Sequence, residues 1–157
     1  MSDTISLFSK RPEPSAEEVV FRPAVYGVLI QNQRVLLQQG TQSGLWRPVG
    51  VVLANGQTPL QALCAQFRAV VHFSPRPGPL IYMEERRSTD GEGRCWRLSL
   101  LYYLVHAAPG IATETDPSPV NDAQQVSWFS VHELSRDQME FGYVAIQTAL
   151  RRLERAP

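Results

Sequence analysis

Short apolar runs separated by polar turns mark the first part of the chain. Residues 25–30 are rich in β-branched and aromatic side chains, which is typical of a buried strand. A polar turn over 31–33 separates this run from a second one over 34–39, so the two are predicted to form a hairpin. After a polar loop over 40–44, a third extended stretch is expected over 46–53.

The clearest helix signal covers residues 59–72. Thr58 is a good N-cap, Pro59 suits the first helical position, and Gln61 completes a capping box. Apolar side chains inside this segment recur at helical spacing and predict one buried stripe. A Ser-Pro pair follows, and a residue before proline avoids helical backbone angles, so the helix is expected to end near His72.

The second half of the chain predicts more strands and a terminal helix. Strands are expected over 79–86 and 94–105, and alternate residues of the second one form an apolar face: Leu98, Leu100, Tyr102 and Leu104. The remaining expected elements are a proline-rich excursion over 107–119, a strand over 126–129, a short helix capped by Ser130 through Leu134, and an amphipathic helix over 141–155.

This order of elements predicts one mixed α/β (α+β) domain over residues 21–157. Residues 1–20 read as an N-terminal arm, because the run Lys10-Arg11-Pro12-Glu13-Pro14 cannot form a regular helix or a central strand. The length of 157 residues suits a single domain.

Charge and cysteine usage exclude several classes of function. With 15 basic and 15 acidic residues the formal net charge is +0, which argues against a nucleic-acid or membrane-surface partner. Cys64 and Cys95 form no C-x-x-C pair, so no zinc site is expected. No signal peptide and no apolar run of membrane-spanning length is visible, and a cytoplasmic protein is expected.

Three local motifs carry a family resemblance. Residues 45–50 (L-W-R-P-V-G) resemble W-x-L-P-G-G, residues 55–63 (N-G-Q-T-P-L-Q-A-L) resemble x-G-E-T-P-x-x-A-L, and residues 127–134 (S-W-F-S-V-H-E-L) resemble W-x-x-x-x-E-L. In this order the motifs resemble the Nudix (MutT-like) hydrolase superfamily over about residues 21–153. The resemblance implies a Nudix-type α/β/α sandwich with a mixed β-sheet.

The catalytic signature of that family, G-x5-E-x7-R-E-U-x-E-E-x-G-U with U apolar, is degenerate in this chain. With Gln57 at the first Glu, Ala65 stands for Arg, Gln66 for the next Glu, and Ala69 and Val70 for the paired Glu. In active members, carboxylates on this helix face hold divalent metal ions, which prefer anionic oxygen ligands. We therefore expect no metal, no cofactor and no catalytic residue at these five box positions.

Other side chains remain candidates for binding. The candidate ligand contacts are Trp46, Arg47, Gln57, Gln66, Tyr82 and Glu84. Aromatic residues in a small domain are usually core residues, and Phe73 is expected to be one. Consecutive strand residues point to opposite faces, so only one of Glu84 and Glu85 is expected to face the cleft.

Two functions are carried forward. The first is a module without pyrophosphohydrolase activity that binds a nucleotide derivative, such as a nucleotide sugar, or a protein. The alternative is a divergent Nudix hydrolase of nucleoside diphosphate-linked substrates that holds Mg²⁺ with ligands outside the box, such as Glu84, Glu85 and Glu92. The competing interpretation of these acids is surface pairing with Arg86, Arg87 and Arg94. The arm and the apolar face over 98–104 also suggest a homodimer.

Overall fold

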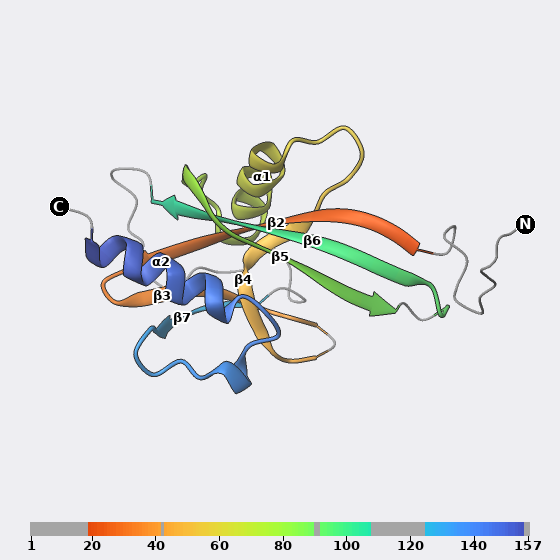
Figure 1. Cartoon of the computed structure of the whole chain (residues 1–157). Helices are drawn as coiled ribbons and strands as arrows, with labels where there is room; N and C mark the ends of the chain where they lie inside the picture. Colours follow the sequence, from red (N-terminus) through yellow and green to blue (C-terminus); the bar gives the residue numbers. More distant parts are fainter. Residues whose placement is uncertain (1–18, 42, 90–91, 108–124, 156–157) are drawn as a thin grey trace, which may run out of the picture.

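A mixed sheet forms the middle layer of the chain (Figure 1). The computed structural model describes residues 19–41, 43–89, 92–107 and 125–155. The 6-stranded sheet has the order β5-β6-β2-β4-β3-β7, with a further pairing between β2 and β3. Its strands are β2 (Val19–Gln31), β3 (Arg34–Gln39), β4 (Trp46–Val52), β5 (Arg76–Thr89), β6 (Cys95–His106) and β7 (Val126–Ser130). The pairing of β2 with β6 is parallel, and the other strand pairs are antiparallel.

Helices cover both faces of the sheet. Helix α1 (Pro59–Val71) packs on one face and α2 (Tyr143–Arg155) on the other (Figure 1). Along β2, Val25 and Leu29 belong to the core under α1, whereas Tyr26 and Val28 belong to the core under α2. Because both of its faces are buried, this central strand reads as a continuous apolar run rather than as an alternating one. The mixed α/β/α sandwich expected from the sequence is confirmed.

Helix α1 begins where its capping signals predict. Thr58 Oγ1 accepts the Gln61 N–H at 3.3 Å, and Gln61 Oε1 accepts the Thr58 N–H at 3.4 Å, which is a capping box. The helix ends because His72 adopts a left-handed backbone with φ of 70°. The His72 N–H then bonds to the carbonyls of Phe67 and Arg68, both at 3.1 Å. The predicted helix is therefore correct to within one residue.

Two strands of the sheet, β5 and β2, are longer than predicted. β5 extends over Arg76–Thr89 because it pairs with β6 as far as Thr89↔Cys95. β2 begins at Val19, where it pairs in parallel with Cys95, so residues 19 and 20 belong to the sheet and not to the expected arm. Residues 1–18 and most of the proline-rich excursion, 108–124, lie outside the described residues.

The short helix expected after Ser130 is absent from the described segment 125–155 at that position. Residues 131–133 form a turn, in which Ser130 Oγ accepts the His132 N–H at 3.3 Å. A single 3-10 turn follows at Arg136–Gln138. The terminal helix begins at Tyr143 rather than at residue 141, because Gly142 has a φ of 95° that a helix does not allow.

The apolar face of β6 is covered within the same chain. Leu100, Tyr102 and Leu104 are buried in the core beneath α2, and Leu98 packs against that core. This face is therefore unavailable to a second copy, and the homodimer loses one of its two supporting arguments. In the described part of the chain, neither helix combines the length and the apolar character that crossing a bilayer requires.

Candidate functional site

The five box positions lie at the start of α1 and along it. Ala65 and Ala69 are exposed, Gln66 is half-buried, and Val70 is 3% exposed inside the core under α1. Gln57 precedes the helix, and its Oε1 accepts the Ala54 N–H at 3.1 Å, which closes the turn before the N-cap. The box positions thus present two amides, two methyl groups and one buried isopropyl group.

This donor set does not fit a divalent cation. Mg²⁺ and Ca²⁺ take oxygen ligands, with carboxylates as their anionic anchors. At the box positions the only side-chain oxygens are the neutral amide oxygens of Gln57 and Gln66, and the first already accepts a backbone hydrogen bond. In the described ranges, no three His, Cys, Asp or Glu side chains gather closely enough to hold a metal ion.

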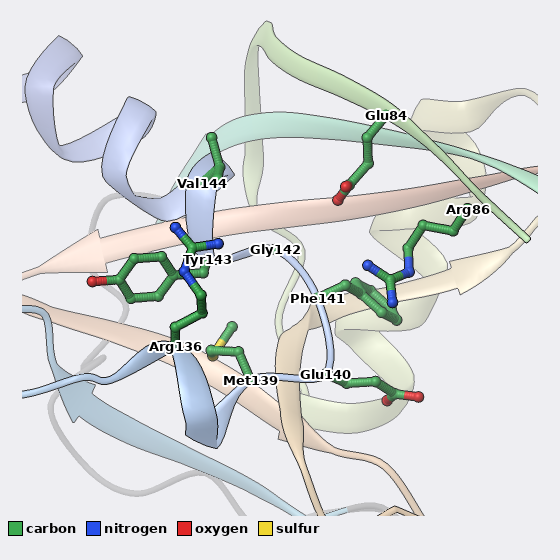
Figure 2. A pocket seen from close by; sticks show the side chains of 9 residues that line it. All are labelled: Glu84, Arg86, Arg136, Met139, Glu140, Phe141, Gly142, Tyr143 and Val144. Atoms are coloured by element: carbon green, nitrogen blue, oxygen red, sulfur yellow. The ribbon is translucent and has the colours of Figure 1, made fainter.

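A cavity of about 240 Å³ lies between β5 and the segment that leads into α2 (Figure 2). We refer to it as the β5–α2 cavity. It combines carboxylates, guanidinium groups and aromatic rings, and its lining residues are Glu84, Arg86, Arg136, Met139, Glu140, Phe141, Gly142, Tyr143 and Val144. Glu84 and Arg86 reach it from β5, with one strand residue between them, so both side chains lie on the same face of the sheet.

A buried tyrosine holds the carboxylate of Glu84. The Tyr102 hydroxyl donates to Glu84 Oε2 at 2.7 Å, and Tyr102 is 0% exposed. Burial raises the pKa of Tyr102 well above its usual value of 10.0, and the hydrogen bond to Glu84 adds to this effect. Tyr102 therefore stays a neutral donor at working pH. One Glu84 lone pair is used by this bond, and others remain to accept N–H groups of a ligand.

Aromatic rings and guanidinium groups meet in the same cavity. The guanidinium carbons of Arg47 and Arg86 each lie 5.7 Å from the ring centroid of Phe141, and that of Arg136 lies 4.7 Å from the Tyr143 ring. Figure 2 shows Arg86 beside Phe141 and Arg136 beside Tyr143. Such cation–π contacts orient a guanidinium without consuming its N–H donors.

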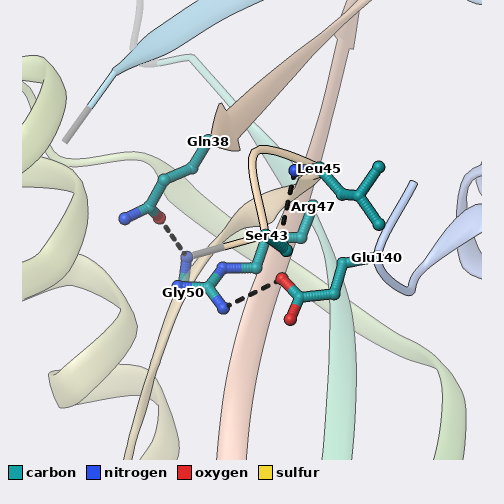
Figure 3. Close-up of polar contacts among 6 residues, drawn as sticks. All are labelled: Gln38, Ser43, Leu45, Arg47, Gly50 and Glu140. Atoms are coloured by element: carbon teal, nitrogen blue, oxygen red, sulfur yellow. Dashed lines mark hydrogen bonds and ion pairs between the residues drawn. The ribbon is translucent and has the colours of Figure 1, made fainter. Parts of the chain in front are cut away.

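A second cavity, of about 310 Å³, adjoins the first. We call it the loop cavity. Its lining residues are Gly40, Thr41, Ser43, Arg47 and Glu140, and Glu140 is the residue that it shares with the β5–α2 cavity. Arg47 Nη1 lies 3.4 Å from Glu140 Oε1 (Figure 3). The backbone of Glu140 is fixed separately, since its N–H donates to the Trp46 carbonyl at 2.8 Å.

Tyr26 lies close to this ion pair. Burial raises the pKa of Tyr26 from 10.0 to about 12, while the positive charge of Arg47 lowers it and the negative charge of Glu140 raises it. Its ring also packs edge-on against Phe141 at a centroid distance of 5.0 Å. Tyr26 is thus a neutral, buried ring that supports Phe141 from the core side.

The structure brings two of the six sequence candidates to these cavities. Glu84 lines the β5–α2 cavity and Arg47 lines the loop cavity. Trp46 packs edge-on against Phe129 at 4.7 Å, and Tyr82 packs against Tyr102 at 5.9 Å, so both serve the core under α2. Among the residues described, Gln57 and Gln66 line neither of these two cavities.

Sequence reasoning missed the residues that precede α2. Arg136 and Glu140 lie between the last predicted strand and the predicted terminal helix, and Phe141 is the first residue of that predicted helix; no motif singles them out. The local signal that was available is the adjacent acid and aromatic residue before Gly142. Phe73, which we expected in the core, does pack on Phe67 with a centroid distance of 6.1 Å.

The three acids considered as relocated metal ligands have different surroundings. Glu85 lies on the strand face opposite Glu84 and pairs with Arg97 at 2.8 Å. Glu92 pairs with Arg94 at 3.7 Å, as the surface interpretation expected, and both side chains are exposed. Neither Glu85 nor Glu92 lines the cavity that contains Glu84.

This architecture is similar to that of solved Nudix hydrolase structures. A MutT Nudix hydrolase from Burkholderia pseudomallei is similar with a TM-score of 0.65 at 18% identity, over 82% of this chain and 97% of that one. The dihydroneopterin triphosphate pyrophosphohydrolase of E. coli gives a TM-score of 0.63 at 14% identity, over 87% and 99% of the two chains. A Nudix hydrolase from Nitrosomonas europaea gives 0.58 at 16% identity, over 87% and 92%.

Sequence comparison adds nothing to this likeness, since no protein-family model and no curated protein matches the chain. At identities this low, structural similarity establishes the fold alone. The chain has the Nudix fold, as the order of its motifs predicted.

Proposed function

We propose that this Nudix-fold chain binds a nucleotide derivative and does not carry out the pyrophosphohydrolase chemistry of the family. One observation carries the proposal: the exposed face of α1 presents Ala65, Gln66 and Ala69 where the family signature has Arg and two of its Glu residues, and Val70 is part of the core.

The chemistry lost with those acids is specific. Divalent ions in such a site activate a water molecule and neutralise charge on the departing phosphate. A general base must also accept a proton near neutral pH, which an amide or an alkyl side chain cannot do. Restoring metal binding at Val70 would require a carboxylate inside the apolar core, where an unpaired charge is strongly unfavourable.

The β5–α2 cavity supports the binding half of the proposal. A nucleotide derivative offers a flat base, N–H donors and anionic phosphates. Phe141 and Tyr143 supply ring surfaces, Glu84 supplies an acceptor, and Arg86 and Arg136 supply positive charge. The volume of about 240 Å³ is below the range of roughly 300–1,000 Å³ typical of whole-ligand sites, so it suits the base while the remainder extends past Glu140.

The first experiment is a thermal-shift panel of nucleotides and nucleotide sugars, with and without Mg²⁺. We expect at least one compound to raise the melting temperature equally in both conditions, without release of phosphate or nucleoside monophosphate. Replacing Phe141 by Leu should weaken that shift, because it removes the ring and keeps most of the apolar volume. Metal-dependent product release by the parent protein would contradict the proposal.

A second candidate is the divergent hydrolase, and one observation favours it. Glu84 and Glu140 line the same cavity from opposite elements, β5 and the segment before α2. Two carboxylates facing one cavity are the minimum from which a Mg²⁺ site could be built. This candidate predicts Mn²⁺- or Mg²⁺-dependent cleavage of a nucleoside diphosphate derivative that is abolished by Glu84→Gln. Absence of turnover at millimolar metal across the same panel would exclude it.

A further inference from the structure

We propose that the loop cavity is an oxyanion site in which Arg47 is the cation and Glu140 occupies the place of the anion when none is bound. The ligand class is a tetrahedral oxyanion, either inorganic phosphate or a phosphate group of a larger molecule. The site is separate from the β5–α2 cavity, so this inference does not depend on nucleotide binding.

The hydrogen-bond donors of the Arg47 guanidinium are poorly satisfied by the described residues around it. Among the described residues, Arg47 forms one ion pair, a contact of 3.4 Å to Glu140 Oε1, which is long for a charge-assisted hydrogen bond. Nε of Arg47 is buried, and no described residue accepts its N–H. A guanidinium is a planar fork with five N–H donors, and a phosphate matches that fork with two parallel bonds. Arg47 therefore has donors that a tetrahedral oxyanion satisfies better than Glu140 does.

Two of the other residues that line the loop cavity carry hydroxyl groups. Ser43 Oγ accepts the Leu45 N–H at 3.1 Å, which leaves its own hydroxyl hydrogen available to donate. Thr41 adds another hydroxyl on the same cavity wall. Arg47 and two hydroxyl groups form a donor-rich lining, and Glu140 is the one anionic residue among the described residues that line it.

Gly40 keeps space open in the loop cavity because it has no side chain. A Cβ atom at this position would lie 2.9 Å from Ser43 Oγ and 3.0 Å from Glu140 Oε1. The φ of Gly40 is outside the left-handed region, so its backbone conformation does not require glycine. The missing side chain matters through the room that it leaves between the hydroxyl and the carboxylate.

Phosphate binding at Arg47 requires the Glu140 side chain to move away from the guanidinium. Its backbone is held by the hydrogen bond to the Trp46 carbonyl, so only the side chain has to move. Glu140 also lines the β5–α2 cavity, where Arg86 and Arg136 are further cationic neighbours. An incoming phosphate takes the Arg47 fork, and the repelled carboxylate turns toward that second cavity.

Binding of inorganic phosphate, measured by calorimetry at constant ionic strength, tests the site with opposed variants. Arg47→Gln should weaken phosphate binding about tenfold or more, because it removes the charge and the fork. Glu140→Gln should tighten binding by roughly three- to tenfold, because it removes the competing anion at nearly constant shape. Gly40→Ala should weaken binding, and Arg151→Gln, at an exposed arginine of α2 that lines neither cavity, is the control that should leave it unchanged.

A merely structural ion pair gives a different pattern. In that case Glu140→Gln would not tighten phosphate binding, and that result would overturn the proposal. The proposal would also be overturned if neither the parent nor Glu140→Gln bound phosphate at tens of millimolar. Arg47→Lys provides a second measurement that keeps the charge and loses the fork, and it controls for any effect of Arg47→Gln on the fold. It should bind phosphate with intermediate affinity, and an affinity equal to that of the parent would contradict the role of the fork.

The same titrations distinguish the two sources of the oxyanion. If the site receives the phosphate of a nucleotide, a nucleoside 5′-diphosphate should bind the parent more tightly than phosphate does, and Arg47→Gln should weaken both. If it receives free phosphate, Arg47→Gln should weaken inorganic phosphate alone. Affinities for both ligands that are indifferent to Arg47 would refute the site, whatever the outcome of the nucleotide panel at Phe141.

Discussion

Tyr102 and Glu84 form a side-chain hydrogen bond that ties the core under α2 to a cavity wall, with 2.7 Å between the phenolic oxygen and Oε2. The donor comes from the buried face of β6 and the acceptor from edge strand β5. The bond fixes a carboxylate beside Arg86 and Phe141 in the lining of the β5–α2 cavity. The position of the Glu84 carboxylate in this cavity therefore depends on a buried residue that does not line the cavity itself.

Removing this donor should have a measurable cost. Tyr102→Phe deletes only the hydroxyl and should lower the free energy of unfolding by about 1.5–3 kcal/mol, the range for a bond to a charged group. Glu84→Gln is the matched change, since an amide oxygen still accepts the bond and should cost less. Chemical denaturation at pH 7 measures both. A Tyr102→Phe protein as stable as the parent would show that the bond contributes nothing net.

The buried tyrosines also predict an alkaline limit. Burial raises the pKa of Tyr26 from 10.0 to about 12, so below pH 10 the residue is neutral in both the folded and unfolded states. Between pH 10 and 12 the unfolded state loses its proton first, and stability falls by up to about 2–3 kcal/mol. Tyr102, with its pKa raised in the same direction, adds to this loss.

Tyr26→Phe should reduce the slope of unfolding free energy against pH over that window. The slope below pH 9 should be unchanged, because neither form of the residue carries charge there. Denaturant titrations at several alkaline pH values give both slopes. An unchanged slope between pH 10 and 12 would mean that Tyr26 ionises equally easily in the folded and unfolded states.

Two glycines separate backbone strain from steric clash. Gly142 and Gly56 have φ of 95° and 84°, so alanine is strained at both positions. At Gly142 a Cβ atom would also lie 2.6 Å from Pro48 Cδ, whereas at Gly56 nothing lies within 4 Å. Gly56→Ala should therefore cost about 1 kcal/mol, and Gly142→Ala clearly more. Equal losses in thermal unfolding would show that the segment before α2 moves freely away from β4.

Local rules account for the parts of the fold that the sequence predicted well. The start of α1 follows from Thr58, Pro59 and Gln61, whose hydrogen bonds all lie within a few residues. The hairpin turn is equally local, with Asn32 and Gln33 at φ of 53° and 61° as such a turn requires. The burial of Val70 also follows, because helical periodicity places it on the stripe with Phe67.

Long-range pairing decides the parts that local rules missed. The polar end of β5 is a strand because β6 pairs with it as far as Thr89, although its own side chains favour a turn. Glu140 reaches the two cavities because its N–H meets the Trp46 carbonyl, a contact across more than ninety residues. No local pattern in the segment before α2 encodes that contact, so the most informative site residues could not be predicted.

Restoring the box acids is the sharpest test of the vacated metal face. Gln57→Glu, Gln66→Glu and Ala69→Glu lie at exposed or half-buried positions and should be tolerated together. Val70→Glu places a carboxylate in the core and should by itself cost several kcal/mol. Val70→Ala is the matched control: it removes buried methyl groups without adding charge, so the difference between the two variants isolates the cost of the carboxylate.

The metal response should follow the charge. With the three tolerated acids in place, Mn²⁺ or Mg²⁺ should raise the melting temperature, because bound metal couples to folding, and the parent should be indifferent. Adding Val70→Glu should lower the stability without metal and enlarge the shift with metal, since the ion offsets part of the burial cost. Differential scanning calorimetry with metal or with EDTA gives both quantities. Equal shifts in the parent and the restored proteins would mean that this helix face is not a vacated metal site, and the placement of the box on Gln57 would be wrong.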